Sequence, residues 1–193
     1  MRLRHPRAGD AAAVWRLVRD SAALDLNSPY AYLLLCTHFR QSCVLAERDE
    51  RVLGAVLGYR PPGDIDRYFV WQVAVAAEAR GEGLARRLVA AALAAAEPAP
   101  RWLEATVTLD NAASLALFRG LARRLEAPFQ DRAGFPGGLF PEPHGDERLI
   151  RVGPLEERAI RGLTGAPEPV PAPRTRAATD LPNPGVSSTG DSP

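Results

Sequence analysis

The spacing of apolar and polar positions predicts two helices within the first 40 residues. Apolar side chains recur at helical spacing after Asp10, which can cap the first helix. The second helix is expected over 29–39, because Ser28 can cap it and Pro29 suits its first position. Apolar residues lie on almost every side of this second helix, which predicts burial in the core or at a subunit interface.

Apolar runs rich in β-formers predict strands further along the chain. The segment 43–59 is typical of a hairpin, with two such runs around a polar turn at 48–51. The almost unbroken apolar run 68–75 is typical of a strand that is covered on both faces. Further strands are expected over 2–5, 102–108 and 147–153.

Two more helices are expected between these strands. One follows "RGEG", and its apolar stripe consists of Leu84, Leu88, Ala92 and Leu93. The other is capped by Asp110 or Asn111. The glycine- and proline-rich stretch 128–146 is expected to be a long loop before the last strand. The order β-α-α-β-β-β-α-β-α-β predicts a mixed α/β fold.

The length and charge of the chain bound its organisation. The 193 residues suffice for one domain with a sizeable core, expected over 1–160. The stretch 161–193 is rich in proline and poor in large apolar residues, so we expect it to be disordered. With 24 basic and 23 acidic residues, the net charge of +1 predicts no general attraction to nucleic acids or membranes.

Several chemistries are excluded by residue type. The chain has no lysine, which rules out Schiff-base chemistry and a P-loop lysine. Its three histidines are scattered, and Cys36 and Cys43 are not spaced as a metal clip, so no metal site is expected. Two cysteines are too few for a disulfide framework, and neither a signal peptide nor a long apolar span is evident. These features predict a cytoplasmic protein.

The stretch "RGEGLARR", residues 80–87, joins the apolar strand to a helix start. A helix N-terminus exposes about four unpaired N–H groups and roughly half a positive charge. Gly81 and Gly83 let the backbone approach an anion, so a pyrophosphate can bind here. An ordinary tight turn with solvated arginines is the alternative. A dinucleotide-binding fingerprint is excluded, because Arg86 stands where its third glycine should be.

Residues 80–85, Arg-Gly-Glu-Gly-Leu-Ala, resemble the R-x-x-G-x-A pyrophosphate motif of the GCN5-related N-acetyltransferases. The resemblance implies an α/β (α+β) fold with a central mixed, mostly antiparallel sheet flanked by helices, and acetyl-CoA as co-substrate. It also implies a strand bulge near Val73–Val75 that leaves backbone donors for the pantetheine and the thioester carbonyl. The cofactor-binding residues implied in this way are Val73, Ala74, Val75, Arg80, Gly81, Glu82, Gly83, Leu84, Ala85, Arg86, Asn111, Ser114 and Phe118.

The helix after Asn111 departs from the family at one position. Many members have a tyrosine there that protonates the departing thiolate, and this chain has Phe118. Because a thiol has a pKa of about 8.5, the thiolate is a tolerable leaving group near neutral pH without that acid.

A narrower resemblance covers about 4–152 and concerns the acetyl acceptor. The segments 14–39, 46–62, 69–88 and 108–125 are similar to the L-2,4-diaminobutyrate acetyltransferases of ectoine biosynthesis. This similarity implies acetyl transfer from acetyl-CoA to the 4-amino group of that diamino acid. The substrate-binding residues that it implies are Asp25, Asn27, Tyr30, Trp71, His144 and Glu147.

An acceptor with two ammonium groups needs acidic partners. Glu147 is the candidate general base, Glu104 is the alternative base, and the backbone N–H of Val75 is expected to polarise the thioester carbonyl. The residues alone allow simpler roles. Asp25 can cap a helix, Trp71 can belong to the core, and Glu147 can be a solvated surface charge.

Two other functions stay open from the sequence. The protein can acetylate another small or peptide amine, or it can be a non-catalytic acyl-CoA-binding regulatory module, which only Phe118 favours. The apolar second helix and the fold together favour a homodimer.

Overall fold

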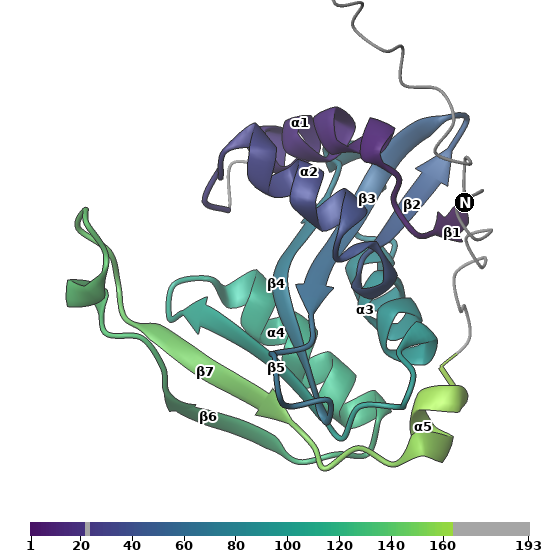
Figure 1. The fold of residues 1–193 in the computed structure, drawn as a ribbon. Coiled ribbons are helices and arrows are strands. Elements are labelled where there is room, and N and C mark those ends of the chain that lie inside the picture. The colour runs from purple at the N-terminus through teal and green to yellow at the C-terminus, as the bar shows by residue number, and fades with distance from the viewer. Residues whose placement is uncertain (22–23, 164–193) are drawn as a thin grey trace, which may run out of the picture.

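The computed structural model describes residues 1–21 and 24–163, so positions 164–193 of the predicted tail lie outside the described residues. Seven strands form one sheet in the order β1-β2-β3-β4-β5-β7-β6 (Figure 1). Only β4 and β5 are parallel neighbours, which confirms the mixed, mostly antiparallel sheet. The strands are β1 Arg2–Arg4, β2 Val44–Arg48, β3 Arg51–Tyr59, β4 Arg67–Val75, β5 Trp102–Thr108, β6 Phe129–Ala133 and β7 Glu147–Val152.

Helices cover both faces of this sheet, and each face has its own apolar core. The helices are α1 Ala11–Ser21, α2 Pro29–Thr37, α3 Leu84–Ala95, α4 Ala112–Arg124 and α5 Glu157–Arg161. α1 and α2 pack on one face, and α3 and α4 on the other (Figure 1). Successive residues of β2 alternate between the two cores, Val44 and Ala46 toward α3 and Leu45 toward α1. Leu163, beyond α5, belongs to the α3 core.

The predicted caps of α2 and α4 are confirmed. The Ser28 hydroxyl accepts a hydrogen bond from the Ala31 N–H at 3.3 Å, and Pro29 is the first helical residue. The Asn111 side chain accepts from the Ser114 N–H at 3.0 Å. The prediction that Asp10 caps α1 was wrong. Asp10 ends a short 3-10 turn, and its carboxylate accepts a hydrogen bond from the backbone N–H of Arg7.

Strands β4 and β5 separate along their length, and this separation positions the site. Their parallel pairing is confined to Arg67–Phe69 opposite Trp102–Glu104. Ala76, just beyond β4, donates its N–H to Leu53 on the β3 side. Because N–H directions alternate along a strand, the N–H of Val75 points toward β5, where no strand pairs with it.

The bulge in β4 lies earlier than predicted. Leu57 pairs with Gln72 and Gly58 pairs with Val70, so Trp71 is the extra residue, whereas Val73–Val75 pair regularly with β3. The reason is on the neighbouring strand. A Cβ on Gly58 would lie 2.7 Å from the carbonyl oxygen of Phe69, so only glycine allows this close approach of β3 to β4.

The predicted cover of β4 on both faces is confirmed, since Tyr68 and Val70 lie in the α3 core and Ala74 lies in the α1 core. One further sequence prediction was wrong. The stretch 128–146 is not one loop, since β6 occupies its first part and pairs with β7. β6 is an edge strand with mostly exposed side chains, so it lacks the apolar pattern that marks a buried strand.

Candidate active site

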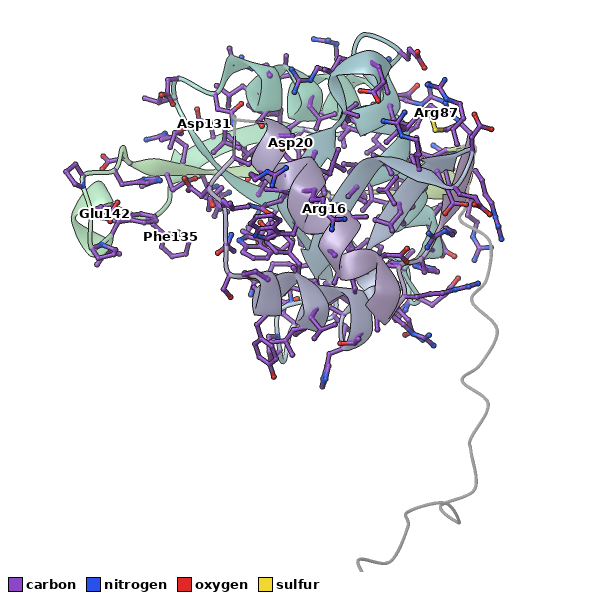
Figure 2. All side chains as sticks on the ribbon, turned by 90° about the horizontal axis from the view of Figure 1, so that it is seen from above. Arg16, Asp20, Arg87, Asp131, Phe135 and Glu142 are labelled. Atoms are coloured by element: carbon purple, nitrogen blue, oxygen red, sulfur yellow. The ribbon has the colours of Figure 1, made fainter. Side chains whose placement is uncertain are left out.

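A cleft of about 750 Å³ opens where β4 and β5 separate. Its walls come from the loop before α2, from β4 and β5, from the start of α4 and from the segment between β6 and β7. That last segment, which includes Phe135 and Glu142, projects from the body of the protein (Figure 2). The volume lies within the range of about 300–1,000 Å³ that is usual for small-ligand pockets.

A second cavity of about 460 Å³ lies beside the cleft, at the start of α3. Gly81 and Gly83 line it with positive φ angles of 81° and 71°, a conformation that glycine adopts without strain. Small residues of α4 form its opposite wall. Leu117 of α4 lines both this cavity and the cleft. The end of β4 also connects them, because Val75 lines this cavity and Val73 lines the cleft.

Two carboxylates and an imidazole meet in the cleft from segments far apart in the sequence. Nε2 of His144 lies 3.5 Å from the Asp25 carboxylate and 3.9 Å from that of Glu147. The ring of Phe140 stacks on His144 at 3.9 Å between centroids. The carbonyl of Gly145, 2.6 Å from Nδ1, and the two carboxylates raise the pKa of His144, against an opposing effect of desolvation.

The backbone of Glu147 is held by hydrogen bonds, whereas one oxygen of its carboxylate has no hydrogen-bond partner. It begins β7, pairs with Thr108, and donates its N–H to the carbonyl of Phe135 at 2.8 Å. Its Oε2 atom is buried and has no hydrogen-bond partner. Buried carboxylate oxygens normally have partners, so this atom is suited to receive a donor from a ligand.

Five of the six residues predicted to bind the acetyl acceptor lie together in the cleft. Asp25, Asn27, Trp71, His144 and Glu147 all line the cleft. Tyr30 does not line it, because its side chain is 65 % exposed on the outer face of α2. Tyr32 is fully buried, and its ring stacks on that of Trp71 at 6.3 Å.

The predicted cofactor residues fall into three groups. Val75, Arg80, Gly81, Gly83, Leu84, Ala85 and Arg86 line the smaller cavity, and Val73, Asn111, Ser114 and Phe118 line the cleft. Ala74 is buried in the α1 core, and Glu82 is exposed and lines neither cavity.

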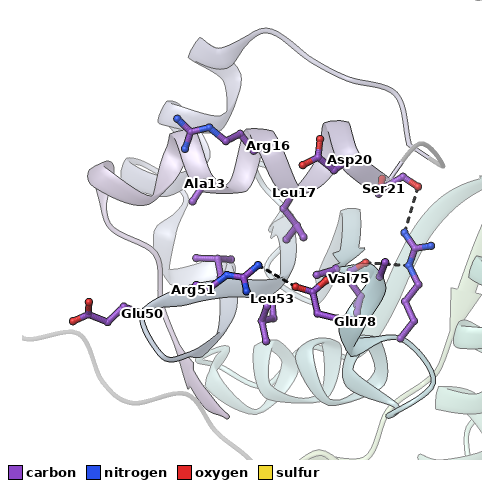
Figure 3. Close-up of a pocket in the computed structure, with 14 residues that line it drawn as sticks. Ala13, Arg16, Leu17, Asp20, Ser21, Glu50, Arg51, Leu53, Val75 and Glu78 are labelled. Carbon is purple, nitrogen blue, oxygen red and sulfur yellow. Dashed lines mark hydrogen bonds and ion pairs between the residues drawn. The ribbon is translucent and has the colours of Figure 1, made fainter.

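Arg80 is held by the protein itself. It donates to the carbonyl of Val75 at 3.2 Å and to that of Ser21 at 3.5 Å (Figure 3). These bonds connect the end of α1 to the turn that carries the two glycines. A third cavity, of about 420 Å³, lies on the α1 side of Arg80 and is lined by mixed charges, including the Arg51–Glu78 pair (Figure 3).

Glu104, the alternative base, points away from the cleft. It is 3 % exposed and pairs with Arg151 at 2.6 Å and with Arg67 at 3.6 Å. It does not line the cleft, whereas its neighbours Ala105 and Thr106 do.

Several residues of the cleft were not predicted, and three of them stand out. Phe135 and Phe140 form an aromatic wall from the stretch expected to be a loop. Gln72 also lines the cleft, and as the one polar side chain within "FVWQVAV" it could have been singled out. No group of metal-ligating side chains occurs among the described residues, and none of the described helices is long and apolar enough to cross a membrane.

Comparisons with known proteins agree with this architecture. The sequence profile of the acetyltransferase (GNAT) family matches residues 12–122. The chain is 44 % identical over 156 residues to the L-2,4-diaminobutyric acid acetyltransferase of Nocardia farcinica, covering 80 % of this chain and 81 % of that protein. It is 46 % identical to the protein of the same name from Halomonas elongata, covering 82 % and 83 %.

A solved structure extends the likeness to three dimensions. It is the diaminobutyrate acetyltransferase EctA from Paenibacillus lautus in complex with L-2,4-diaminobutyric acid and coenzyme A. That structure superposes with a TM-score of 0.75 at 38 % identity, covering 79 % of this chain and 93 % of that chain. The chain therefore belongs to the acetyltransferase (GNAT) family and, within it, to the group of L-2,4-diaminobutyric acid acetyltransferases.

Proposed function

We propose that this protein transfers the acetyl group of acetyl-CoA to the 4-amino group of L-2,4-diaminobutyrate. The products are N4-acetyl-L-2,4-diaminobutyrate and coenzyme A, and the reaction serves the synthesis of ectoine, a compatible solute, under osmotic stress. The observation that carries the proposal is the buried, unpartnered Oε2 of Glu147 in a cleft that shares Leu117 with the glycine-lined cavity. The names of the relatives support the choice of acceptor.

The two cavities divide the binding of the substrates. The pyrophosphate of acetyl-CoA lies against the backbone of Gly81 and Gly83 at the start of α3, where N–H groups and the helix dipole favour an anion. The pantetheine follows the open side of β4, and the N–H of Val75 polarises the thioester carbonyl. The diamino acid occupies the cleft, with its ammonium groups toward Asp25 and Glu147.

The acceptor must lose a proton in order to attack. An amine with a pKa of about 10.4 is neutral in roughly one molecule in a thousand at pH 7.4, which costs about 4 kcal/mol. The neutral nitrogen forms its bond to the carbonyl carbon, the C–S bond breaks, and coenzyme A leaves as the thiolate. The ammonium loses its first proton to solvent before the attack, and Glu147 takes the second proton, directly or through a water, as the amide forms. Phe118 offers no proton to the thiolate, which the thiol's own pKa makes tolerable.

Thiol release with a panel of amines tests the proposal. We expect fast release and a product acetylated at nitrogen 4 with L-2,4-diaminobutyrate, and much slower release with ornithine, lysine, putrescine and a peptide N-terminus. Faster turnover of another amine would show that this amine is the acceptor instead. Binding of acetyl-CoA without turnover of any amine would indicate a regulatory module.

The raised pKa of His144 predicts a pH dependence of acceptor binding. Protonated His144 places a positive charge between Asp25 and Glu147, where it competes with the ammonium groups of the substrate. Since its pKa is raised, this charge persists to higher pH than for an ordinary histidine and is lost as the pH rises through that value. The KM for the diamino acid should therefore fall over that interval.

The control for this pH dependence is His144→Gln. Titration of the substrate's own amines affects both enzymes equally, so the difference between their two KM profiles isolates the histidine. Profiles of identical shape would contradict the assignment.

We also propose that the protein acts as a homodimer through the outer face of α2. Tyr30 and Leu33 are exposed there, and the exposed Leu26 and Phe39 flank the helix. Sedimentation equilibrium should give twice the chain mass of 20.8 kDa, and Leu33→Glu should lower it to one chain mass. A monomeric wild-type protein would exclude this state.

We propose a cytoplasmic location as well. Both cysteines are free and buried, whereas exported proteins typically have structural disulfides. Burial also raises the pKa of each thiol to about 12, which makes it unreactive. Recovery of the protein with a periplasmic or membrane marker on cell fractionation would contradict this location.

A further inference from the structure

Gln72 is a buried polar side chain at the back of the cleft. With 6 % of its surface exposed, it is one of two buried polar or charged residues among those described, the other being the ion-paired Glu104. It follows the bulge residue Trp71 in β4, and the hydrogen bonds of its amide go to Tyr32 and to the backbone of Asp25.

Three hydrogen bonds join Gln72 to the loop before α2. The Asn27 N–H donates to the Tyr32 hydroxyl oxygen at 3.3 Å, that hydroxyl donates to Gln72 Oε1 at 3.2 Å, and Gln72 Nε2 donates to the carbonyl of Asp25 at 2.7 Å. Only one orientation of the amide satisfies this arrangement, because a carbonyl can only accept and Oε1 must therefore face the hydroxyl.

In the described part of the loop, Asn27 Nδ2 also donates to the Asp25 carbonyl, at 3.3 Å, but this bond stays within the loop. Residues 24–28 belong to no helix or strand, and the side chain of Asp25 is largely exposed. The bonds from Gln72 and Tyr32 fix the backbone at Asp25 and Asn27, and thus place the Asp25 carboxylate 3.5 Å from His144. Tyr32 also stacks on Trp71, which lines the cleft. Gln72 and Tyr32 therefore help to position Trp71 as well as the loop.

We propose that Gln72 is a positioning residue for the acceptor, which acts by holding the Asp25–Asn27 loop over the cleft. This inference rests on the proposed function and adds a determinant of acceptor affinity that touches neither coenzyme A nor the reacting atoms. The alternative is a buried amide that only satisfies its own hydrogen bonds in the core. The two roles differ in which kinetic constant a substitution changes.

Gln72→Met retains the size of the side chain and removes both hydrogen bonds of the Gln72 amide, those to Tyr32 and to the Asp25 carbonyl. We expect the KM for L-2,4-diaminobutyrate to rise about 10-fold, in keeping with the loss of a buried hydrogen-bond network. The KM for acetyl-CoA should change less than about twofold, since the glycine-lined cavity is untouched. The matched control is Leu45→Ala in the same core, which should lower the melting temperature without changing either KM.

A double-substitution cycle with Asp25→Ala tests the route of the effect. If Gln72 acts through Asp25, Gln72→Met should raise the acceptor KM much less in the Asp25→Ala background than in the wild type. An unchanged acceptor KM in Gln72→Met, or an equal rise in both backgrounds, would overturn the proposal.

Amide hydrogen exchange separates this inference from the proposed function. If the wild type does not acetylate L-2,4-diaminobutyrate at all, the function fails, and the loop can still be examined without substrate. The Asn27 amide should exchange at least 10-fold faster in Gln72→Met than in Leu45→Ala if Gln72 holds the loop. Equal exchange in the two variants would overturn the positioning role.

Discussion

Glu147→Gln should lower kcat/KM for L-2,4-diaminobutyrate by about 100-fold without destabilising the protein. The carboxylate of Glu147 has one buried oxygen without a hydrogen-bond partner, which destabilises the folded protein in the absence of substrate. Replacing the carboxylate by a neutral amide should therefore not lower the stability. A charge-assisted bond to the substrate ammonium contributes about 1.5–3 kcal/mol, and its loss lowers affinity by roughly 10- to 150-fold. If Glu147 also takes the amine proton, kcat falls as well.

The measurement separates these two contributions. Steady-state kinetics with each substrate varied gives kcat and both KM values, and urea unfolding gives the free energy of unfolding. The matched control is Glu142→Gln, the same change at an exposed position of the projecting segment that precedes β7 (Figure 2). Unchanged kinetics in Glu147→Gln, or an equal loss in Glu142→Gln, would remove Glu147 from the site.

Local signals made most of the fold predictable from the sequence. Ser28 and Asn111 cap helices through bonds to residues three positions away, so the sequence itself contains both partners. The bulge was misplaced because its cause, Gly58, lies on another strand and acts only once β3 and β4 are paired. β6 was missed for a similar reason, since pairing with β7 holds it and its own side chains are mostly exposed.

The site was predictable only as far as its contacts are local or its family motif is clear. The turn with Gly81 and Gly83 lies at a helix start, as expected from spacing alone. Asp25 and His144 are 119 positions apart and meet only because the loop before α2 and the projecting segment line the same cleft. The position of Tyr30 in the sequence does not reveal whether its side chain lies on an exposed helix face or in a pocket wall. In the structure it lies on the exposed face.

Glu104→Gln should have the opposite signature to Glu147→Gln, with lower stability and retained activity. Glu104 is buried, accepts a hydrogen bond from Arg151 and forms an ion pair with Arg67 at 3.6 Å. Loss of its charge therefore leaves Arg151 without its carboxylate partner, whereas Arg67 keeps its hydrogen bond to Asp64. Removing one member of a buried ion pair commonly costs 3–5 kcal/mol, and because the arginines are partly exposed we expect about 2–3 kcal/mol here.

Urea unfolding and kcat per folded molecule test this contrast. Asp131→Asn is the matched control, since Asp131 pairs with Arg148 at 2.8 Å in the same sheet but at a more exposed position, where the expected cost is below about 1 kcal/mol. Because Glu104 does not line the cleft, kcat and both KM values should stay within about twofold of the wild type. A large fall in kcat with stability intact would instead make Glu104 the base. The sheet would then have to bring its carboxylate from the arginine side to the cleft side, which the Arg151 bond opposes.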